Sequence, residues 1–347
     1  MLPMTKDNGN RTMHTIGRAV AFCGLLLLSF PVPASPPEPM PLEFFASPSK
    51  FKTARISPNG EHVAISFEEG DNEGKVAITT TDLETVTAVY AFGPGKHVGN
   101  VRWINDERLL MDNWVDTGYL DGRRQDPRTF IGGYDGSNRR ALETGNFFSF
   151  FIDALESDSR HFLMGRIHWM GDRALKLHRI DVKRGRSDYF RGAPAPEDGA
   201  RITDIALDSR DRIRFAIERH PGKEDYRAED DRYRLHYRLP GEDWQVTELD
   251  AARPAPEYQR LGFGPGDRHL YFLSNYDQPG RDTLGVYRFD FEAGVIEPVF
   301  RHPDVDIEDA LRGPRGEVLG VSYQPGYPTE YYLYPDHPVV KLSLIHI

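Results

Sequence analysis

Gly320-Val-Ser-Tyr-Gln324 comes nearest in this sequence to a serine-hydrolase motif. A nucleophile elbow needs glycine on both sides of the serine, because its strained turn leaves no room for side chains. The last position here is glutamine and the segment lies inside a predicted strand, so we interpret Ser322 as a strand residue. Gly262-Phe-Gly-Pro-Gly266 has the glycines of a phosphate loop, but proline removes an amide donor and no helix follows, which predicts a hairpin turn.

Signals for metal or amine binding are weak. The twelve histidines are scattered singly, without a His-Glu-x-x-His helix or closely spaced Cys/His ligands. Asp116-Thr-Gly-Tyr-Leu-Asp-Gly122 has some acidic spacing of a calcium loop, but the loop's last place falls on Pro127. Glu68-Glu69 would suit a free peptide amine, although ordinary acidity at a strand end is the better interpretation. We therefore predict no catalytic residue, metal site or cofactor, and we assign no substrate-binding residue.

The elements around these residues follow from a repeated turn. Ile56-Ser-Pro-Asn-Gly-Glu-His-Val-Ala-Ile65 and Phe263-Gly-Pro-Gly-Asp-Arg-His-Leu-Tyr-Phe272 each end one strand, turn and start another. Proline sets φ for one turn position, Asn or Gly then takes the left-handed conformation, and alternating apolar residues resume beyond it. Both segments are therefore predicted to be β-hairpins.

Weaker copies of this hairpin bring the total to six predicted strand pairs. They are Lys52–Ser57 with Glu61–Phe67, Val98–Ile104 with Arg108–Val115, Phe148–Asp153 with His161–Ile167, Arg201–Ala206 with Arg212–Glu218, Tyr258–Phe263 with His269–Asn275, and Asp306–Leu311 with Glu317–Tyr323. Their second-strand anchors, Val63, Leu109, Phe162, Ile213, Leu270 and Val318, are 46 to 57 positions apart. This spacing is typical of one propeller blade.

A second recurrent turn joins the predicted third and fourth strands. It occurs at Thr81–Thr85, Ile180–Gly185 and Phe289–Gly294, where aspartate caps the turn and, in two copies, glycine takes the positive φ. Apolar residues at helix spacing occur only in runs of a turn or two, which disfavours a sheet built from alternating strands and helices. The predicted fold is all-β, a β-propeller of four-stranded antiparallel blades with about six present of an expected seven, and therefore an incomplete ring.

The charged stretch from Lys223 to Arg234 interrupts the fourth predicted blade between its second and third strands. Runs of mixed charge are usually solvated, so we predict a long exposed hairpin loop. The alternative is that this loop lines a central funnel.

The N-terminus has the pattern of a secretory signal. Basic residues precede an apolar run from Ala19 to Phe30, and Val32-Pro-Ala34 follows. The run is shorter than the roughly 20 residues of a membrane-spanning helix, so we predict cleavage after Ala34, a mature start at Ser35, and a periplasmic or secreted protein. Cys23, the single cysteine, follows Phe22 where a lipoprotein signal would have a small residue, so we expect no membrane attachment after cleavage.

Composition indicates a folded, acidic protein. Hydrophobic residues make up 39% and aromatic residues 12% of the chain, and the formal charge is −10. Arg123-Arg124, Arg139-Arg140 and the pair Arg184 and Arg186 lie near predicted turns among acidic neighbours. Because an acidic surface repels phosphate backbones and no basic face accompanies these pairs, we expect no nucleic-acid partner.

Several segments together resemble a known family. They are Pro41-Leu-Glu-Phe-Phe-Ala-Ser-Pro48, Ala54-Arg-Ile-Ser-Pro-Asn-Gly60, Val101-Arg-Trp-Ile-Asn-Asp-Glu-Arg-Leu109 and Leu270-Tyr-Phe-Leu-Ser-Asn275. They are similar to the propeller of bacterial prolyl oligopeptidase-family serine peptidases, of the dipeptidyl aminopeptidase and acylaminoacyl peptidase type, over roughly Pro41 to Pro338. In that family an α/β-hydrolase domain with a Ser-Asp-His triad follows the propeller. The resemblance thus implies a triad beyond Ile347, and the acidic motif with which dipeptidyl peptidases hold a substrate amine is not found.

These observations divide the chain into a signal peptide (1–34), a linker and lead-in segment (35–50), a truncated propeller (51–340) and a tail (341–347). Leu342-Ser-Leu-Ile-His-Ile347 resembles the translation of a transposon adaptor used in DNA library preparation, so we expect this tail to be non-native.

The resemblance implies a non-catalytic propeller of an exported serine peptidase that gates the access of peptide substrates to a missing active site. The chain itself would then be inactive and, as an open ring, prone to aggregate through its strand edges. The alternative is a stand-alone periplasmic propeller that binds protein partners. The oligomeric state stays open.

Overall fold

The structure is a computed structural model that describes residues 50–70, 73–118, 122–142, 147–168, 170, 173–222, 231–248, 258–275 and 283–346. All of them belong to one compact unit that begins at Lys50. The predicted signal peptide, its cleavage site at Ala34 and Ser35, and nearly all of the predicted linker lie outside the described residues.

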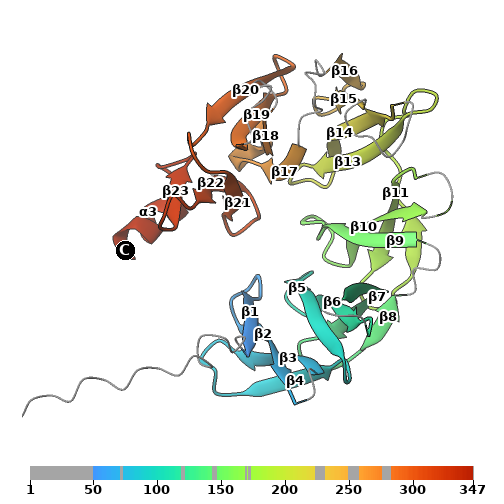
Figure 1. The fold of residues 1–347 in the computed structure, drawn as a ribbon, viewed down its shortest axis with the longest axis vertical. Helices are drawn as coiled ribbons and strands as arrows, with labels where there is room; N and C mark the ends of the chain where they lie inside the picture. The colour runs from blue at the N-terminus through green and yellow to red at the C-terminus, as the bar shows by residue number, and fades with distance from the viewer. Residues whose placement is uncertain are drawn as a thin grey trace, which may run out of the picture. The chain divides into compact units, whose positions relative to one another are not determined.

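The described strands form six antiparallel units, which we call blades 1 to 6 (Figure 1). Blade 1 is β1 (Phe51–Ile56), β2 (His62–Glu69), β3 (Glu73–Thr80) and β4 (Val86–Ala91); blade 2 is β5 (Lys96–Trp103), β6 (Arg108–Asp116), β7 (Arg123–Gly133) and β8 (Arg140–Leu142). Blade 3 is β9 (Phe147–Asp153), β10 (His161–His168), β11 (Lys176–Asp181) and β12 (Ser187–Tyr189); blade 4 is β13 (Arg201–Leu207), β14 (Ile213–His220), β15 (Arg232–Tyr237) and β16 (Gln245–Glu248). Blade 5 is β17 (Tyr258–Phe263), β18 (His269–Ser274), β19 (Gly285–Asp290) and β20 (Val295–Phe300); blade 6 is β21 (Ile307–Arg312), β22 (Val318–Tyr323) and β23 (Thr329–Tyr332).

All six predicted strand pairs are present, with ends that differ by at most two residues. Each blade pairs its strands in chain order, as a meander does, and a single parallel bridge between Glu73 and Lys96 joins blades 1 and 2. The described residues also form a three-residue 3₁₀ turn, η2 (Pro265–Asp267), and an α-helix, α3 (Pro338–His346). We did not predict α3 from the sequence. The predicted origin of residues 341–347 stays a prediction.

The turn chemistry explains why the hairpins were predictable. The Oδ1 atom of Asp181 accepts hydrogen bonds from the amides of Lys183 and Arg184, at 2.8 and 2.7 Å, and Gly185 has φ +66°. In the first hairpin it is Gly60, with φ +75°, that takes the left-handed conformation. Asn59 instead uses its side-chain oxygen to accept hydrogen bonds from Ser57 and from the amide of Glu61.

Blades pack face to face in chain order through separate hydrophobic clusters. Members from the two blades that share a cluster are, for example, Val76 and Leu109 for blades 1 and 2, Leu110 and Phe162 for blades 2 and 3, Leu163 and Ile205 for blades 3 and 4, Phe215 and Phe289 for blades 4 and 5, and Leu273 and Val321 for blades 5 and 6. Antiparallel meanders that stack in this way define a β-propeller. The predicted fold class is confirmed.

The loop predicted from Lys223 to Arg234 is partly wrong. Residues 223–230 lie outside the described residues, but Arg232 and Arg234 belong to β15, and the Asp231 side chain is only 1% exposed in an ion pair with Arg219. Residues of opposite charge, such as Glu218 and Arg234, face one another across β14 and β15 and are compatible with strand pairing. A run of mixed charge therefore does not indicate a solvated loop over its whole length.

Candidate functional site

Blade 4 contains the polar group that we call the Glu218 cluster, formed by Glu197, Glu218, His220, Arg234 and His236. The Glu218 side chain is fully buried, and its Oε2 lies 2.6 Å from Nε2 of His236. Its Oε1 is bound by Nε2 of His220 and lies 3.5 Å from Nη1 of Arg234. Arg234 also forms an ion pair with Glu197, whose side chain is 60% exposed. One buried carboxylate therefore has three hydrogen-bonding partners.

Strand geometry brings these residues together. Glu218 and His220 are two positions apart on β14, so both face the same side of the sheet. Arg234 pairs with Glu218 across the β14–β15 ladder, and His236 pairs with Ala216, which places both on that side as well. Glu197 comes from the connection between β12 and β13. The pair Glu218-x-His220 was a usable signal in the sequence, but its partners on another strand and in a connection were not.

The charges of the Glu218 cluster are mutually compensating. Burial acts to raise the pKa of Glu218, but hydrogen bonds and positive charge from His236 and His220 outweigh it and lower the pKa below its ordinary 4.5. A buried carboxylate without such partners would be strongly unfavourable. The Glu218 cluster can therefore hold a negative charge inside the blade at neutral pH.

A second buried histidine links blades 1 and 2. His97 on β5 lies with Nδ1 2.8 Å from Oε1 of Glu68 and with Nε2 2.9 Å from Oδ1 of Asp116. Each ring nitrogen of His97 thus contacts a different carboxylate. Because Glu68 is on β2 of blade 1 and Asp116 is on β6 of blade 2, this group ties the two blades together.

This arrangement accounts for two of the sequence candidates. Besides His97, Glu68 lies 3.6 Å from Nζ of Lys52, and Glu69 is bound by Nζ of Lys75 at 2.6 Å. Both carboxylates of the acidic pair thus have a lysine within ion-pair distance in this structure. Asp116, the first residue of the possible calcium loop, is bound to His97, and residues 119–121 of that loop lie outside the described residues.

The other candidates lie where the sequence placed them. Ser322 is the last residue but one of β22, paired with Asp309 and Glu330 on the flanking strands. Gly262 belongs to β17, and Gly266, with φ +77°, lies in the turn that leads to β18. Neither segment forms a nucleophile elbow or a phosphate loop. Among the basic residues near the turns, Arg186 lies 3.4 Å from Asp188, Arg123 lies 3.6 Å from Asp116, and Arg139 donates to the carbonyl oxygen of Ala91.

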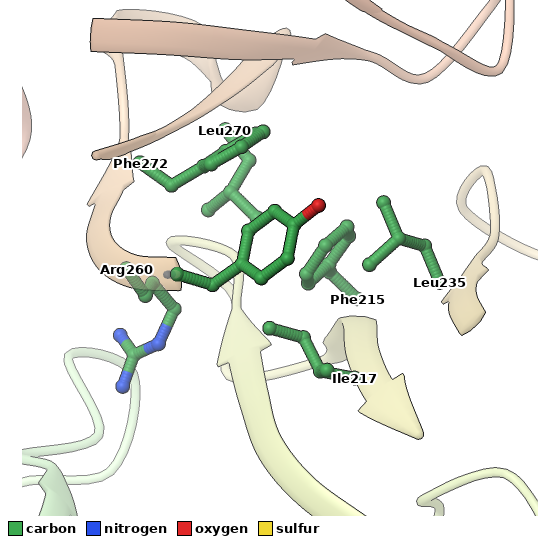
Figure 2. A pocket seen from close by; sticks show the side chains of 7 residues that line it. Phe215, Ile217, Leu235, Arg260, Leu270 and Phe272 are labelled. Carbon is green, nitrogen blue, oxygen red and sulfur yellow. The ribbon is translucent and has the colours of Figure 1, made fainter. Parts of the chain in front are cut away.

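A small hollow lies between blades 4 and 5 (Figure 2). Its lining residues are Phe215, Ile217, Leu235, Tyr258, Arg260, Leu270 and Phe272. Figure 2 shows the guanidinium of Arg260 pointing away from the apolar side chains, and its Nε donates to Asp204 at 3.0 Å. The hollow measures about 260 Å³ including open solvent, below the roughly 300–1,000 Å³ of ligand pockets. We interpret it as a packing gap in the hydrophobic contact between blades 4 and 5, not as a ligand site.

Comparisons with known proteins support the fold. No protein-family profile matches the sequence, and no curated protein matches it. Prolyl oligopeptidase B from Galerina marginata, bound to a 35-residue hydrolysis and macrocyclisation substrate, is similar in structure with a TM-score of 0.50 and 10% identity, over 82% of this chain and 42% of that one.

Within the described part of the chain, no helix is long and apolar enough to cross a membrane.

Two further structures match more weakly. The β-propeller domain of the trilobed protease from Pyrococcus furiosus has a TM-score of 0.49 and 11% identity, over 81% of each chain. One of two prolyl endopeptidases studied for inter-domain dynamics has a TM-score of 0.48 and 12% identity, over 84% of this chain and 40% of its own. This chain thus spans about two fifths of the length of the two prolyl peptidases. At these identities the similarity concerns the fold, which is a propeller like those of prolyl oligopeptidase-family peptidases.

Proposed function

We propose that this chain is the propeller of an exported serine peptidase and that it restricts which peptides reach an α/β-hydrolase active site encoded beyond Ile347. The observation that carries the proposal is the six-bladed antiparallel fold, together with its match to a prolyl oligopeptidase over 82% of this chain. The resemblance of Pro41–Pro48 and of the blade motifs to this family supports it further.

The proposed mechanism is exclusion by size. Blades joined to their neighbours by hydrophobic clusters form a stiff body, since close-packed interiors transmit strain instead of yielding to it. A stiff body over an active site admits short or unstructured peptides and excludes folded proteins. The acyl transfer itself would use a serine activated by histidine in the second domain.

The test uses the protein encoded by the complete gene. We expect it to hydrolyse peptide p-nitroanilides, to be inactivated by a fluorophosphonate, and to lose activity when the serine of its Gly-x-Ser-x-Gly motif is changed to alanine. We also expect it to cleave a short peptide but not the same sequence placed inside a folded protein. Absence of fluorophosphonate-sensitive hydrolysis would refute the peptidase proposal, and equal cleavage of both substrates would refute gating.

A further inference from the structure

We propose that the Glu218 cluster binds a divalent transition-metal ion of the zinc class, with Glu197, Glu218 and His220 as its ligands. One carboxylate oxygen from each glutamate and a ring nitrogen of His220 lie within 4.8 Å of one another. Zinc ligands lie about 2.0–2.2 Å from the ion, so modest side-chain movement brings these three atoms into one coordination sphere. This site is independent of the proposed peptidase function.

The donor atoms select the class of ion. An imidazole nitrogen with two carboxylate oxygens suits zinc, cobalt or manganese, whereas calcium and magnesium prefer oxygen ligands alone. Three protein ligands leave a fourth position for water. Glu197, with its side chain 60% exposed, provides the side from which an ion would enter.

Glu218 is already oriented for this task. Nε2 of His236 lies 2.6 Å from Oε2 of Glu218, which directs the other oxygen, Oε1, toward His220. Hydrogen bonds that hold a ligating carboxylate in this way are typical of metal sites. His236 is itself nearly buried, so its ring has little freedom to move.

The charge balance also favours a cation. The two glutamates supply two negative charges and Arg234 one permanent positive charge, and a histidine that ligates a metal is neutral, so the metal-binding form of the cluster has an excess of negative charge. Arg234 has an alternative partner, because its Nε lies 3.4 Å from Oε1 of Glu248. When an ion binds, Arg234 can keep that contact while Glu197 turns to the metal.

His97 provides a natural contrast. It is also a buried histidine between two carboxylates, but Glu68 and Asp116 contact opposite nitrogens of its ring. Their oxygens are therefore separated by the imidazole and share no position for an ion. A His97 variant removes a similar buried group without removing a proposed ligand.

Metal binding would fix the connection between β12 and β13 onto β14, because Glu197 lies in that connection. An ion that binds only the folded chain raises its melting temperature. For a domain of this size we expect saturating zinc to raise Tm by about 2–4 °C or more.

The experiment is calorimetric titration of the purified, chelator-treated chain with zinc chloride, together with elemental analysis after dialysis. We expect one zinc per chain, visible absorption bands on substitution with cobalt, and no comparable binding of calcium or magnesium. His220→Ala and Glu197→Gln should each weaken zinc binding at least about tenfold. His97→Ala and Glu292→Gln, which lie outside the Glu218 cluster, serve as controls and should keep the affinity of the original chain.

Zinc uptake with unchanged affinity in both His220→Ala and Glu197→Gln would overturn the assignment. So would the absence of stoichiometric uptake by the original chain. Circular dichroism of each variant checks that it is folded, and Glu197→Gln, at an exposed position, keeps the test valid if His220→Ala does not fold.

Discussion

Glu68 and Glu218 occupy the same place in the repeat, five positions after the anchors Val63 and Ile213. The Glu68 side chain nevertheless faces the blade that follows its own in the chain, whereas the Glu218 side chain faces the blade that precedes its own. Glu68 faces blade 2 and meets His97, whereas Glu218 lies on the side of β14 that faces blade 3. The cause is a β-bulge: Leu207 pairs with Ile213 and Ala206 with Phe215, which leaves Arg214 unpaired. One extra residue reverses the face of every residue that follows it.

His97→Ala should lower the free energy of unfolding at pH 7 by about 2–4 kcal/mol, because it leaves two carboxylates without their shared donor. Despite burial, the hydrogen bond from His97 and the charge of Lys52 lower the pKa of Glu68 below 4.5. A lowered carboxyl pKa stabilises the fold above about pH 4.5, and this stabilisation is lost as the pH falls through the folded-state pKa.

Urea unfolding of both chains at pH 7 and pH 3.5 measures this contribution. The difference between them should shrink at the lower pH. His178→Ala, which removes a partly exposed ring bound to Ser187, is the control and should cost about 1 kcal/mol. A His97→Ala chain as stable as the control at pH 7 would show that His97 does not join the blades.

Glu156→Gln should raise the melting temperature at pH 8 but not at pH 4.5. Partial desolvation, followed by the negative charges of Asp153 and Glu317, raises the pKa of Glu156, which lies at the surface, to about 7 from 4.5. The folded chain therefore favours the protonated carboxyl, and this group lowers stability progressively as the pH rises from about 4.5 to 7. Glutamine has no such charge.

Melting curves from pH 4.5 to 8 follow this effect. Glu292→Gln, in the exposed turn before β20, is the control and should shift Tm little at any pH. A constant difference between Glu156→Gln and the original chain over the whole range would contradict the expected titration.

Much of the fold could be predicted because the hairpins depend on local chemistry. Pro58 with Gly60, and Asp181 with Gly185, define their turns within a few residues, so strand ends follow from the sequence. The Glu218 cluster could not be predicted in the same way. It depends on the β-bulge at Arg214, which has no partner on β13, and on Arg234 and His236, which lie on a different strand from Glu218. No local sequence pattern indicates the bulge or the strand pairing.

Gly74→Ala should destabilise the chain by about 3 kcal/mol. A Cβ at Gly74 would lie 2.5 Å from the amide nitrogen of Val98 and 2.7 Å from the carbonyl oxygen of Lys96. These are backbone atoms at the bridge between β3 and β5, so they cannot yield without separating blades 1 and 2.

Gly136→Ala is the matched control for Gly74→Ala. Its added Cβ would meet only Ala88, at 3.6 Å, but φ of +80° makes any side chain there strained by about 1–2 kcal/mol. Thermal or urea unfolding of the two variants should therefore rank Gly74→Ala as clearly the less stable. The reverse order would argue against the close approach of these blades.

Replacing Val86 and Val89 with threonine should reduce self-association of the purified chain. Both valines are more than half exposed, and register places them on the face of blade 1 that points away from blade 2. Exposed apolar strand surfaces favour association. Light scattering coupled to size-exclusion chromatography compares the double variant with the original, and Leu83→Thr, in the adjacent exposed turn, is the control.

The central claim is that this propeller belongs to a serine peptidase, and the DNA that follows the codon of Val340 in the source genome tests it most directly. We expect the reading frame to continue through a further blade into roughly two hundred residues that contain Gly-x-Ser-x-Gly in a strand–turn–helix context. A stop codon directly after one more blade would contradict the claim and favour a stand-alone binding propeller.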